Sequence, residues 1–353
     1  SSSGSSTSNA VIPLPLSAAS ATNLIASSLQ QQTKTSSPSS SSNFLDNSVD
    51  LSINNLLKYN QRREEVCGRT IPSPTSRIIG GEGARFGEFP YQVHIKIAKH
   101  QCGGALVDRQ SIVTAAHCVY HFISRAPVSK LQIVIGAYDI EDEQYQDIPP
   151  QYFKVNKVKL HPQFRFSASH PDRYDIAILK LDKPVKYTDN VLPVCLPSLN
   201  YKFENMIGTV TGFGKTDPSL SNRYGTRLLQ KVDVPIIDNA QCERWHRTRG
   251  IDLKIFPEMM CAGYEDGLKD ACVGDSGGPL VVKMAPPSSP QSQSSSPDDG
   301  AGGANRAEPA RWTLAGITSA GFGCAQSRQP GTCDHDESHH RSNTMHYMYG
   351  SSI

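Results

Sequence analysis

The sequence has no long apolar run, little net charge and no closely spaced cysteine pair. Its 353 residues contain no stretch of about eighteen or more apolar residues, so we expect no membrane span. The formal net charge of +2 gives no long-range field that would attract nucleic acid. None of the nine cysteines forms a C-x-x-C pair, a spacing typical of zinc ligands. We therefore expect no nucleic-acid partner, and we interpret the cysteines as disulfide partners.

Disulfide-bonded cysteines indicate an oxidising compartment, so we expect a secreted, extracellular protein. The sequence begins at Ser1, and no charged segment precedes the apolar stretch Val11–Leu16 as it would in a signal peptide. We interpret the sequence as a fragment or a mature form.

Two segments have a composition that cannot form a packed core. Residues 1–66 are mostly Ser, Thr, Asn and Gln, and they bury too little apolar surface to offset the entropy lost on ordering. We expect this leader to be disordered. Residues 284–310 are rich in Ser, Pro, Gln, Gly and Asp, and we interpret them as a surface insertion between two strands.

From Ile78 onward the chain consists of short apolar segments that are separated by Gly, Pro, Asp or Asn. Segments of this kind predict the strands of an all-β barrel or sandwich. The predicted strands are Tyr91–Ile97, Ser111–Ala115, Leu131–Ile135, Tyr152–Leu160, Ile176–Leu181, Gly208–Thr211, Lys231–Ile236, Pro279–Lys283 and Trp312–Ile317.

Three motifs follow one another in the order histidine, aspartate, serine. They are Thr-Ala-Ala-His-Cys around His117, Asp-Ile-Ala-Ile-Leu-Lys-Leu from Asp175, and Gly-Asp-Ser-Gly-Gly-Pro-Leu around Ser276. Together and in this order they resemble the catalytic blocks of chymotrypsin/trypsin-like serine proteases. The resemblance covers Arg77 to Gly331 and implies two antiparallel six-stranded β-barrels over residues 78–331.

The resemblance implies a catalytic role for each motif. A serine hydroxyl is a poor nucleophile at neutral pH, so Ser276 needs a base, His117, to take its proton. Asp175 would orient the imidazole, and the N–H groups of Gly274 and Ser276 would form the oxyanion hole. The implied reaction hydrolyses protein substrates through an acyl-enzyme, without a cofactor or a metal. The structural alternatives are a core histidine, an acid at the start of a strand and a turn serine.

The segment Arg77-Ile-Ile-Gly-Gly81 resembles the activation site of the family. Cleavage after Arg77 would free the α-amino group of Ile78, which would insert beside Asp275 and order the oxyanion loop. The protein would then be a zymogen with residues 67–77 as its activation segment. An activating protease and serpin-type inhibitors are the implied partners, and the alternative for Arg77 is a solvated linker arginine.

The resemblance also implies cleavage after Arg or Lys. Asp270 lies six residues before Ser276, where trypsin-like relatives have an acidic residue at the bottom of the primary pocket. Ser319, Gly321 and Gly331 would form the pocket walls. The structural alternative for Asp270 is an exposed loop residue. If the leader continues upstream into a cysteine-rich module, as in arthropod cascade proteases, a cascade role follows.

Four disulfides are implied by the resemblance: Cys102–Cys118, Cys242–Cys261, Cys272–Cys324 and Cys67–Cys195. The last of these would keep the leader attached to the catalytic unit after cleavage. Cys333 is left over, which indicates a free thiol or an intermolecular bridge.

The resemblance ends after Gly331. The family continues there with a strand that closes the second barrel and with a C-terminal helix, whereas residues 332–353 show no apolar alternation. We therefore expect the last strand and the helix to be missing or altered, which would leave an open barrel edge. This loss favours an alternative function, an impaired protease homologue that acts as a binding or regulatory module. We interpret the tail residues Cys333, His335, His339, His340 and His346 as solvated and not metal-bound.

Overall fold

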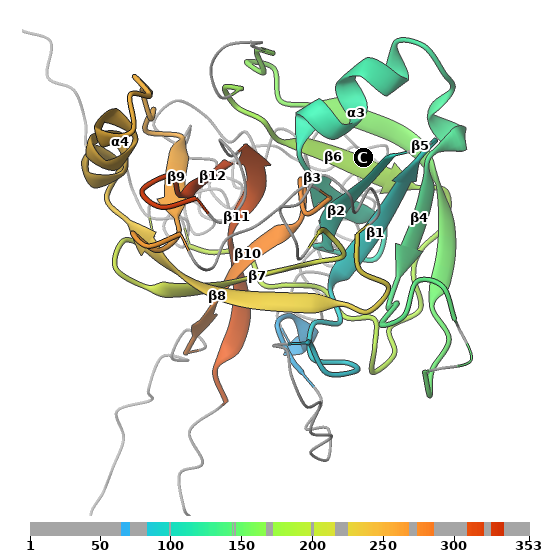
Figure 1. Cartoon of the computed structure of the whole chain (residues 1–353). Coiled ribbons are helices and arrows are strands. Elements are labelled where there is room, and N and C mark those ends of the chain that lie inside the picture. The colour runs from blue at the N-terminus through green and yellow to red at the C-terminus, as the bar shows by residue number, and fades with distance from the viewer. Residues whose placement is uncertain are drawn as a thin grey trace, which may run out of the picture. The chain divides into compact units, whose positions relative to one another are not determined.

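The computed structural model describes residues 65–70, 83–98, 100–142, 144, 146–166, 172–198, 201–215, 225–267, 274–285, 309–320 and 326–334. These residues belong to one compact unit of the chain, Gln61–Ile353. They form two closed barrels of six antiparallel strands, as expected from the sequence (Figure 1). Residues 1–64 of the predicted leader 1–66 and most of the predicted insertion 284–310 lie outside the described residues.

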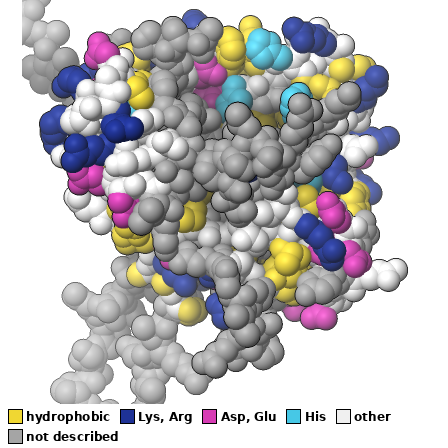
Figure 2. Space-filling model, in the orientation of Figure 1, with side chains coloured by type: hydrophobic (Ala, Val, Ile, Leu, Met, Phe, Trp, Pro, Cys, Tyr) yellow, Lys and Arg dark blue, Asp and Glu magenta, His cyan; other side chains and the backbone are white. Residues whose placement is uncertain are grey.

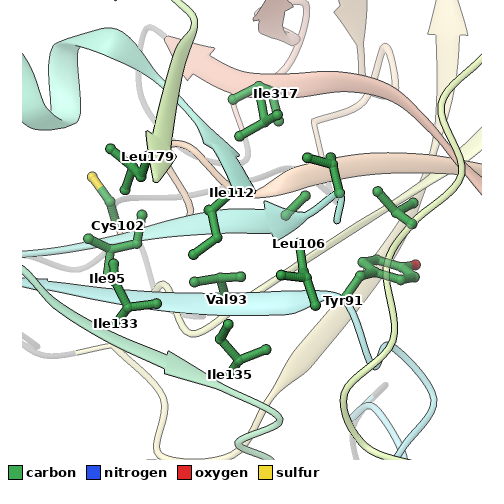
Figure 3. Packing of buried hydrophobic residues seen from close by; sticks show 14 of the residues in the cluster. Tyr91, Val93, Ile95, Cys102, Leu106, Ile112, Ile133, Ile135, Leu179 and Ile317 are labelled. Atoms are coloured by element: carbon green, nitrogen blue, oxygen red, sulfur yellow. The ribbon is translucent and has the colours of Figure 1, made fainter. Parts of the chain in front are cut away.

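The first barrel runs in the order β1-β2-β3-β6-β5-β4. Its strands are β1 (Gln92–Ile97), β2 (His100–Leu106), β3 (Ser111–Thr114), β4 (Gln132–Ile135), β5 (Gln151–Leu160) and β6 (Ala177–Leu181). Alternate apolar residues point into the barrel, so that Val93 and Ile95 of β1 lie opposite Ile135 and Ile133 of β4 (Figure 3). All four are fully buried. Burial of each such side chain is worth about 1.5–3 kcal/mol, which makes this interior the main source of stability.

The second barrel runs in the order β10-β11-β12-β9-β8-β7. Its strands are β7 (Ile207–Gly212), β8 (Gln230–Ile237), β9 (Met259–Ala262), β10 (Pro279–Met284), β11 (Arg311–Ala320) and β12 (Gly331–Asp334). Its core includes Val210, Ile236, Leu280 and Val282. These residues come from strands that the apolar pattern predicted.

The predicted loss of the last strand is wrong. Gly331–Asp334 forms β12, which pairs antiparallel with both β11 and β9 and so closes the second barrel. Cys333 is 4% exposed and packs in the core of this barrel. Because two neighbouring strands supply the hydrogen bonds, β12 forms without the apolar alternation that a half-exposed strand would show. Residues 335–353 lie outside the described part, so the expected loss or alteration of the C-terminal helix stays a prediction.

Among the described residues, the barrels are accompanied by the helices α3 (Ala116–Ile123) and α4 (Asn239–Thr248) and by a short 3-10 turn, η1 (Val128–Lys130). The Asp238 side chain caps α4 by accepting the backbone N–H of Gln241 at 2.9 Å. α4 buries Cys242 and His246, while Lys and Arg side chains gather over its outer face (Figure 2). In the described part of the chain, no helix has the length and apolar character needed to cross a membrane.

Three disulfides join described residues: Cys67–Cys195, Cys102–Cys118 and Cys242–Cys261. They are pairs that the resemblance implied, whereas Cys272 and Cys324 lie outside the described residues. The Cys67 segment is also bound by its backbone. The N–H of Gly68 donates to the carbonyl of Pro193 at 2.8 Å, and the carbonyl of Gly68 accepts the N–H of Trp312 at 2.9 Å. The segment that precedes the predicted cleavage point is therefore attached to the folded unit.

Candidate active site

The candidate general base lies in the first turn of α3. The first N–H groups of a helix have no partner within the helix, and Ala115 at the N-cap offers no side-chain acceptor. The backbone N–H of His117 donates instead to Oδ1 of Asp175 at 2.7 Å. Asp175 therefore performs the capping role and fixes the start of this helix.

Asp175 lies just before β6 and is completely buried. Besides the backbone contact, its Oδ2 lies 2.6 Å from Nδ1 of His117 and accepts a 2.6 Å hydrogen bond from the hydroxyl of Ser319. A buried carboxylate is stable only when donors replace water around it, as they do here. Because Nδ1 faces the carboxylate, Nε2 is the ring nitrogen that can accept a proton.

The charges around His117 favour its protonated form. Burial lowers the pKa of the imidazole, whereas the hydrogen bond and charge of Asp175 and the charge of Asp172 raise it. The carboxylates prevail, so the pKa of His117 lies above its usual value. A base with a raised pKa accepts a proton more readily, which suits a general base near neutral pH.

Ser276 lies on the loop that leads into β10. Its carbonyl accepts the backbone N–H of Gly103 at 2.8 Å. Sγ of Cys118 lies 3.6 Å from this carbonyl oxygen and 3.7 Å from Nε2 of His117. Ser276 is therefore brought beside the imidazole, although among the described residues no hydrogen bond joins its hydroxyl to Nε2. Such bonds commonly tighten only when substrate binds.

Two glycines shape the loop around Ser276. Gly274 and Gly277 have φ angles of +103° and +79°, in the region that residues with a Cβ rarely adopt. A Cβ at position 277 would lie 2.3 Å from Oγ1 of Thr114. The N–H of Gly277 donates to the carbonyl of Thr318 at 2.7 Å. The loop is thus held between the first barrel and β11.

Asp275 presents its carboxylate to the end of β7. Oδ1 accepts the backbone N–H of Gly214 at 2.8 Å. A Cβ at Gly212 would lie 2.0 Å from the same oxygen, so glycine provides the space that the carboxylate occupies. Arg77 and Ile78 lie outside the described residues, and the expected partnership of Ile78 with Asp275 stays a prediction.

The predicted pocket residues are only partly described. Ser319 and Gly331 lie on neighbouring strands, β11 and β12, whereas Asp270 and Gly321 lie outside the described residues. Sequence reasoning assigned Ser319 to a pocket wall and missed its hydrogen bond to Asp175. The two residues are 144 positions apart, and no local signal connects them.

Metal binding by these residues is disfavoured by their other contacts. Ligand atoms of His117, Asp172 and Asp175 lie within 4.8 Å of one another, as do those of Cys102, His117 and Cys118. The two cysteines form a disulfide and so offer no thiolate. Both oxygens of Asp175 are already acceptors for His117, and Oδ2 also accepts from Ser319. We assign no metal or cofactor to this site.

Comparison with known protein families identifies the relationship of the chain. The family model described as Trypsin matches residues 78–335. The chain belongs to the trypsin family. The match of this trypsin-family domain extends beyond Gly331 and includes β12, in agreement with the closed second barrel.

Relatives of this trypsin-family chain include two serine proteases of Drosophila melanogaster and a coagulation factor of Bos taurus. Serine proteinase stubble of Drosophila melanogaster is 35% identical over 280 residues, which cover 77% of this chain and 31% of the relative. Serine protease filzig of Drosophila melanogaster is 32% identical over 324 residues, 83% of this chain and 17% of the relative. Coagulation factor XI of Bos taurus is 33% identical over 277 residues, which cover 76% of this chain and 37% of the relative. The chain thus spans only 17% to 37% of the length of these relatives.

Proposed function

We propose that this trypsin-family chain is a secreted serine endopeptidase that cuts after Arg or Lys. The observation that most directly supports this proposal is that the carboxylate of Asp175 binds both the backbone N–H and Nδ1 of His117. This arrangement fixes the ring and its tautomer and directs Nε2 away from Asp175. It is the arrangement that a general base needs when it serves a neighbouring hydroxyl.

In the proposed reaction the Ser276 hydroxyl attacks the scissile carbonyl and transfers its proton to Nε2 of His117. The imidazolium that forms is stabilised by Asp175 and then protonates the leaving amine. The N–H groups of Gly274 and Ser276 would bind the oxyanion, a contribution of about 10²–10³ in rate for one such donor. Water then hydrolyses the acyl-enzyme by the same proton transfers in reverse.

Activation is proposed to follow cleavage after Arg77. The carboxylate of Asp275, held by the N–H of Gly214, is the proposed partner of the new α-amino group of Ile78. The Cys67–Cys195 disulfide would retain the leader as a second chain. Asp270 is the proposed determinant of Arg or Lys preference. Protein substrates, an activating protease and serpin-type inhibitors are the proposed partners.

The alternative of an impaired homologue loses its main support. It rested on an open second barrel, and β12 closes that barrel by pairing with β9 and β11. Gly331, which we propose as a pocket-wall residue, begins this paired strand. We propose no second function.

Burst titration of the trypsin-treated protein with an arginine-ester titrant tests the proposal. We expect a stoichiometric burst from the parent chain, none from Ser276→Ala, and an undiminished burst from Ser198→Ala, an exposed serine control. Arg77→Gln should stay inactive after trypsin treatment, whereas Arg69→Gln, in the same leader, should activate normally. A burst from Ser276→Ala, or none from folded and correctly cleaved parent protein, would contradict the assignment.

A further inference from the structure

A row of lysines follows the paired strands β5 and β6 of the first barrel. Lys154, Lys157 and Lys159 belong to β5, Lys180 belongs to β6, and Lys183 follows the end of β6. The side chains of residues 154, 157 and 183 are exposed, whereas those of residues 159 and 180 are partly buried. These five residues are called the lysine row below. None of them belongs to the motifs that indicated a protease.

A β-bulge turns the lysines of β5 outward together. In a regular strand, Lys154 and Lys157 would lie on opposite faces, because side chains alternate. The pairing of β5 with β6 shifts here, so that Val155 lies opposite Leu181 and Lys157 lies opposite Lys180. Val155 and Leu181 point into the barrel and are each 2% exposed. The extra residue at the bulge therefore places Lys157 on the same outer face as Lys154.

This arrangement brings positive charges together. Lys157 and Lys180 lie directly opposite each other on the two strands, and like charges at such positions destabilise a sheet. The Nζ of Lys180 donates to Oγ of Ser111 at 2.7 Å. Burial, with the charges of Lys157 and Lys180, lowers the pKa of Lys159. The fold thus keeps these cations close together at a cost in stability, and such conflicts are typical of functional surfaces.

The exposed members of the row are accessible to an anionic partner. Among the described residues, Lys154, Lys157 and Lys183 form no ion pair. The Nζ of Lys183 lies 5.5 Å from the ring centre of Phe153. One acidic side chain, Asp182, lies beside the row, and its Oδ1 accepts the backbone N–H of Lys154 at 3.2 Å. Five lysines and one aspartate give this surface a net charge of +4 (5 − 1 = 4).

We propose that the lysine row binds a linear sulfated polysaccharide. Lys154 and Lys159 are separated by about 15 Å along β5, so the charges form a line and do not converge on one point as in a site for a single anion. A linear polyanion can present successive sulfate groups to successive lysines, and the attraction between them is electrostatic. Because such polysaccharides are extracellular, this assignment rests on the proposed secretion of the chain.

A membrane surface fits the row less well. Basic surfaces that bind membranes combine their charge with an apolar face that enters the lipid. Within β5, all of whose residues are described, Tyr152 is the one large apolar side chain that is highly exposed, at 48%. The row therefore offers a line of charge without the apolar area that insertion requires.

Binding of heparin to the Ser276→Ala protein tests the proposal. This background lacks the proposed nucleophile, so the result does not depend on whether the parent chain is an active protease. Lys154→Gln/Lys157→Gln should elute from immobilised heparin at lower salt and should bind soluble heparin about two- to thirtyfold more weakly. Lys154→Arg/Lys157→Arg keeps both charges and should retain the affinity. Urea unfolding should show that the Gln variant is at least as stable as the parent, because it relieves the repulsion with Lys180.

A matched control separates the row from net charge. Arg247 and Arg249, at the end of α4, are also exposed, and Arg247→Gln/Arg249→Gln changes the net charge equally. This variant should keep most of the affinity for heparin. Equal losses in the two Gln variants, or an unchanged affinity in Lys154→Gln/Lys157→Gln, would overturn the proposal. Equally tight binding to duplex DNA, or to vesicles of phosphatidylcholine and phosphatidylserine, would overturn the assignment to a polysaccharide.

Discussion

Replacement of Arg173 by alanine should destabilise the protein more than replacement of its partner. The Nε of Arg173 lies 2.5 Å from Oε1 of Glu258, and the two side chains are 37% and 6% exposed. The carboxylate is thus the buried member of the pair and the guanidinium the partly solvated one. Removal of arginine leaves a buried charge without its cation, whereas removal of glutamate leaves a cation that water can reach.

The expected magnitude lies between two limits. Loss of one partner from a fully buried pair costs about 3–5 kcal/mol, and an exposed pair is worth about 0–1 kcal/mol. For a pair with one partly exposed member we expect about 2 kcal/mol. The guanidinium of Arg173 also lies 3.9 Å from the ring centre of Phe256, and loss of that contact adds about 0.5–1 kcal/mol. Arg173→Ala should therefore cost about 2.5–3 kcal/mol and Glu258→Ala about 1 kcal/mol.

Urea unfolding of both single variants and the double variant checks this asymmetry. All should carry Ser276→Ala to prevent autolysis, with the disulfides intact. The double variant should cost about 1–2 kcal/mol less than the sum of the singles. Arg328→Ala, which breaks an exposed pair with Glu265, should cost under about 0.5 kcal/mol. Equal costs for the two single variants, or strict additivity, would refute the reasoning.

Two further predictions concern pH and the leader. Burial, with the charge of Lys96, lowers the pKa of His94 to about 4, although the hydrogen bond from its Nε2 to Oε1 of Gln101 opposes this shift. In the unfolded chain this histidine takes up its proton at about pH 6.5, so the free energy of unfolding should fall as the pH drops from about 6.5 to about 4. His94→Asn should reduce this pH dependence of the urea unfolding midpoint. An unchanged pH dependence would exclude His94 as its source. After cleavage at Arg77, Cys67→Ser should release the leader on a non-reducing gel and Cys333→Ser should not; a leader that stays attached in Cys67→Ser would disprove the tether.

The apolar pattern predicted most of the strands but missed β2. The segment His100–Leu106 contains Gly103 and Gly104, which read as turn residues in a sequence. In the fold a Cβ at Gly103 would lie 2.6 Å from Cα of Gly278. The glycine that hides this strand in the sequence is therefore required by the close approach of the Ser276 loop.

The sequence pattern failed to predict β9 and β12 for a different reason. Gly331–Asp334 is short and polar, and its pairing depends on β11 and β9 on either side. Information about such a strand resides in its neighbours, since strand preference depends strongly on context. The open barrel edge was inferred from local composition alone, and that inference failed because the closing contacts are distant in sequence.

The candidate site was predictable to the extent that its residues lie in compact motifs. His117, Asp175 and Ser276 are each embedded in a recognisable segment. The hydrogen bond from Ser319 and the proximity of Asp172 were not predicted. Both depend on the tertiary fold: Ser319 reaches Asp175 from the other barrel, and Asp172 lies within 4.8 Å of His117 although 55 positions separate them (172 − 117 = 55).

The site is divided between the barrels, and this division determines how mutations should act. His117 and Asp175 belong to the first barrel, while Ser276 and Ser319 belong to the second. Contacts between the barrels therefore set the catalytic geometry: Ser319 with Asp175, and the N–H of Gly103 with the carbonyl of Ser276. The buried cluster of the first barrel extends to Val281, Leu314 and Ile317 of the second barrel, so the barrels are joined by apolar packing as well. Weakening the few polar contacts therefore removes little buried apolar area. Activity should consequently be lost at such positions before stability is, whereas substitutions inside either barrel should reduce both together.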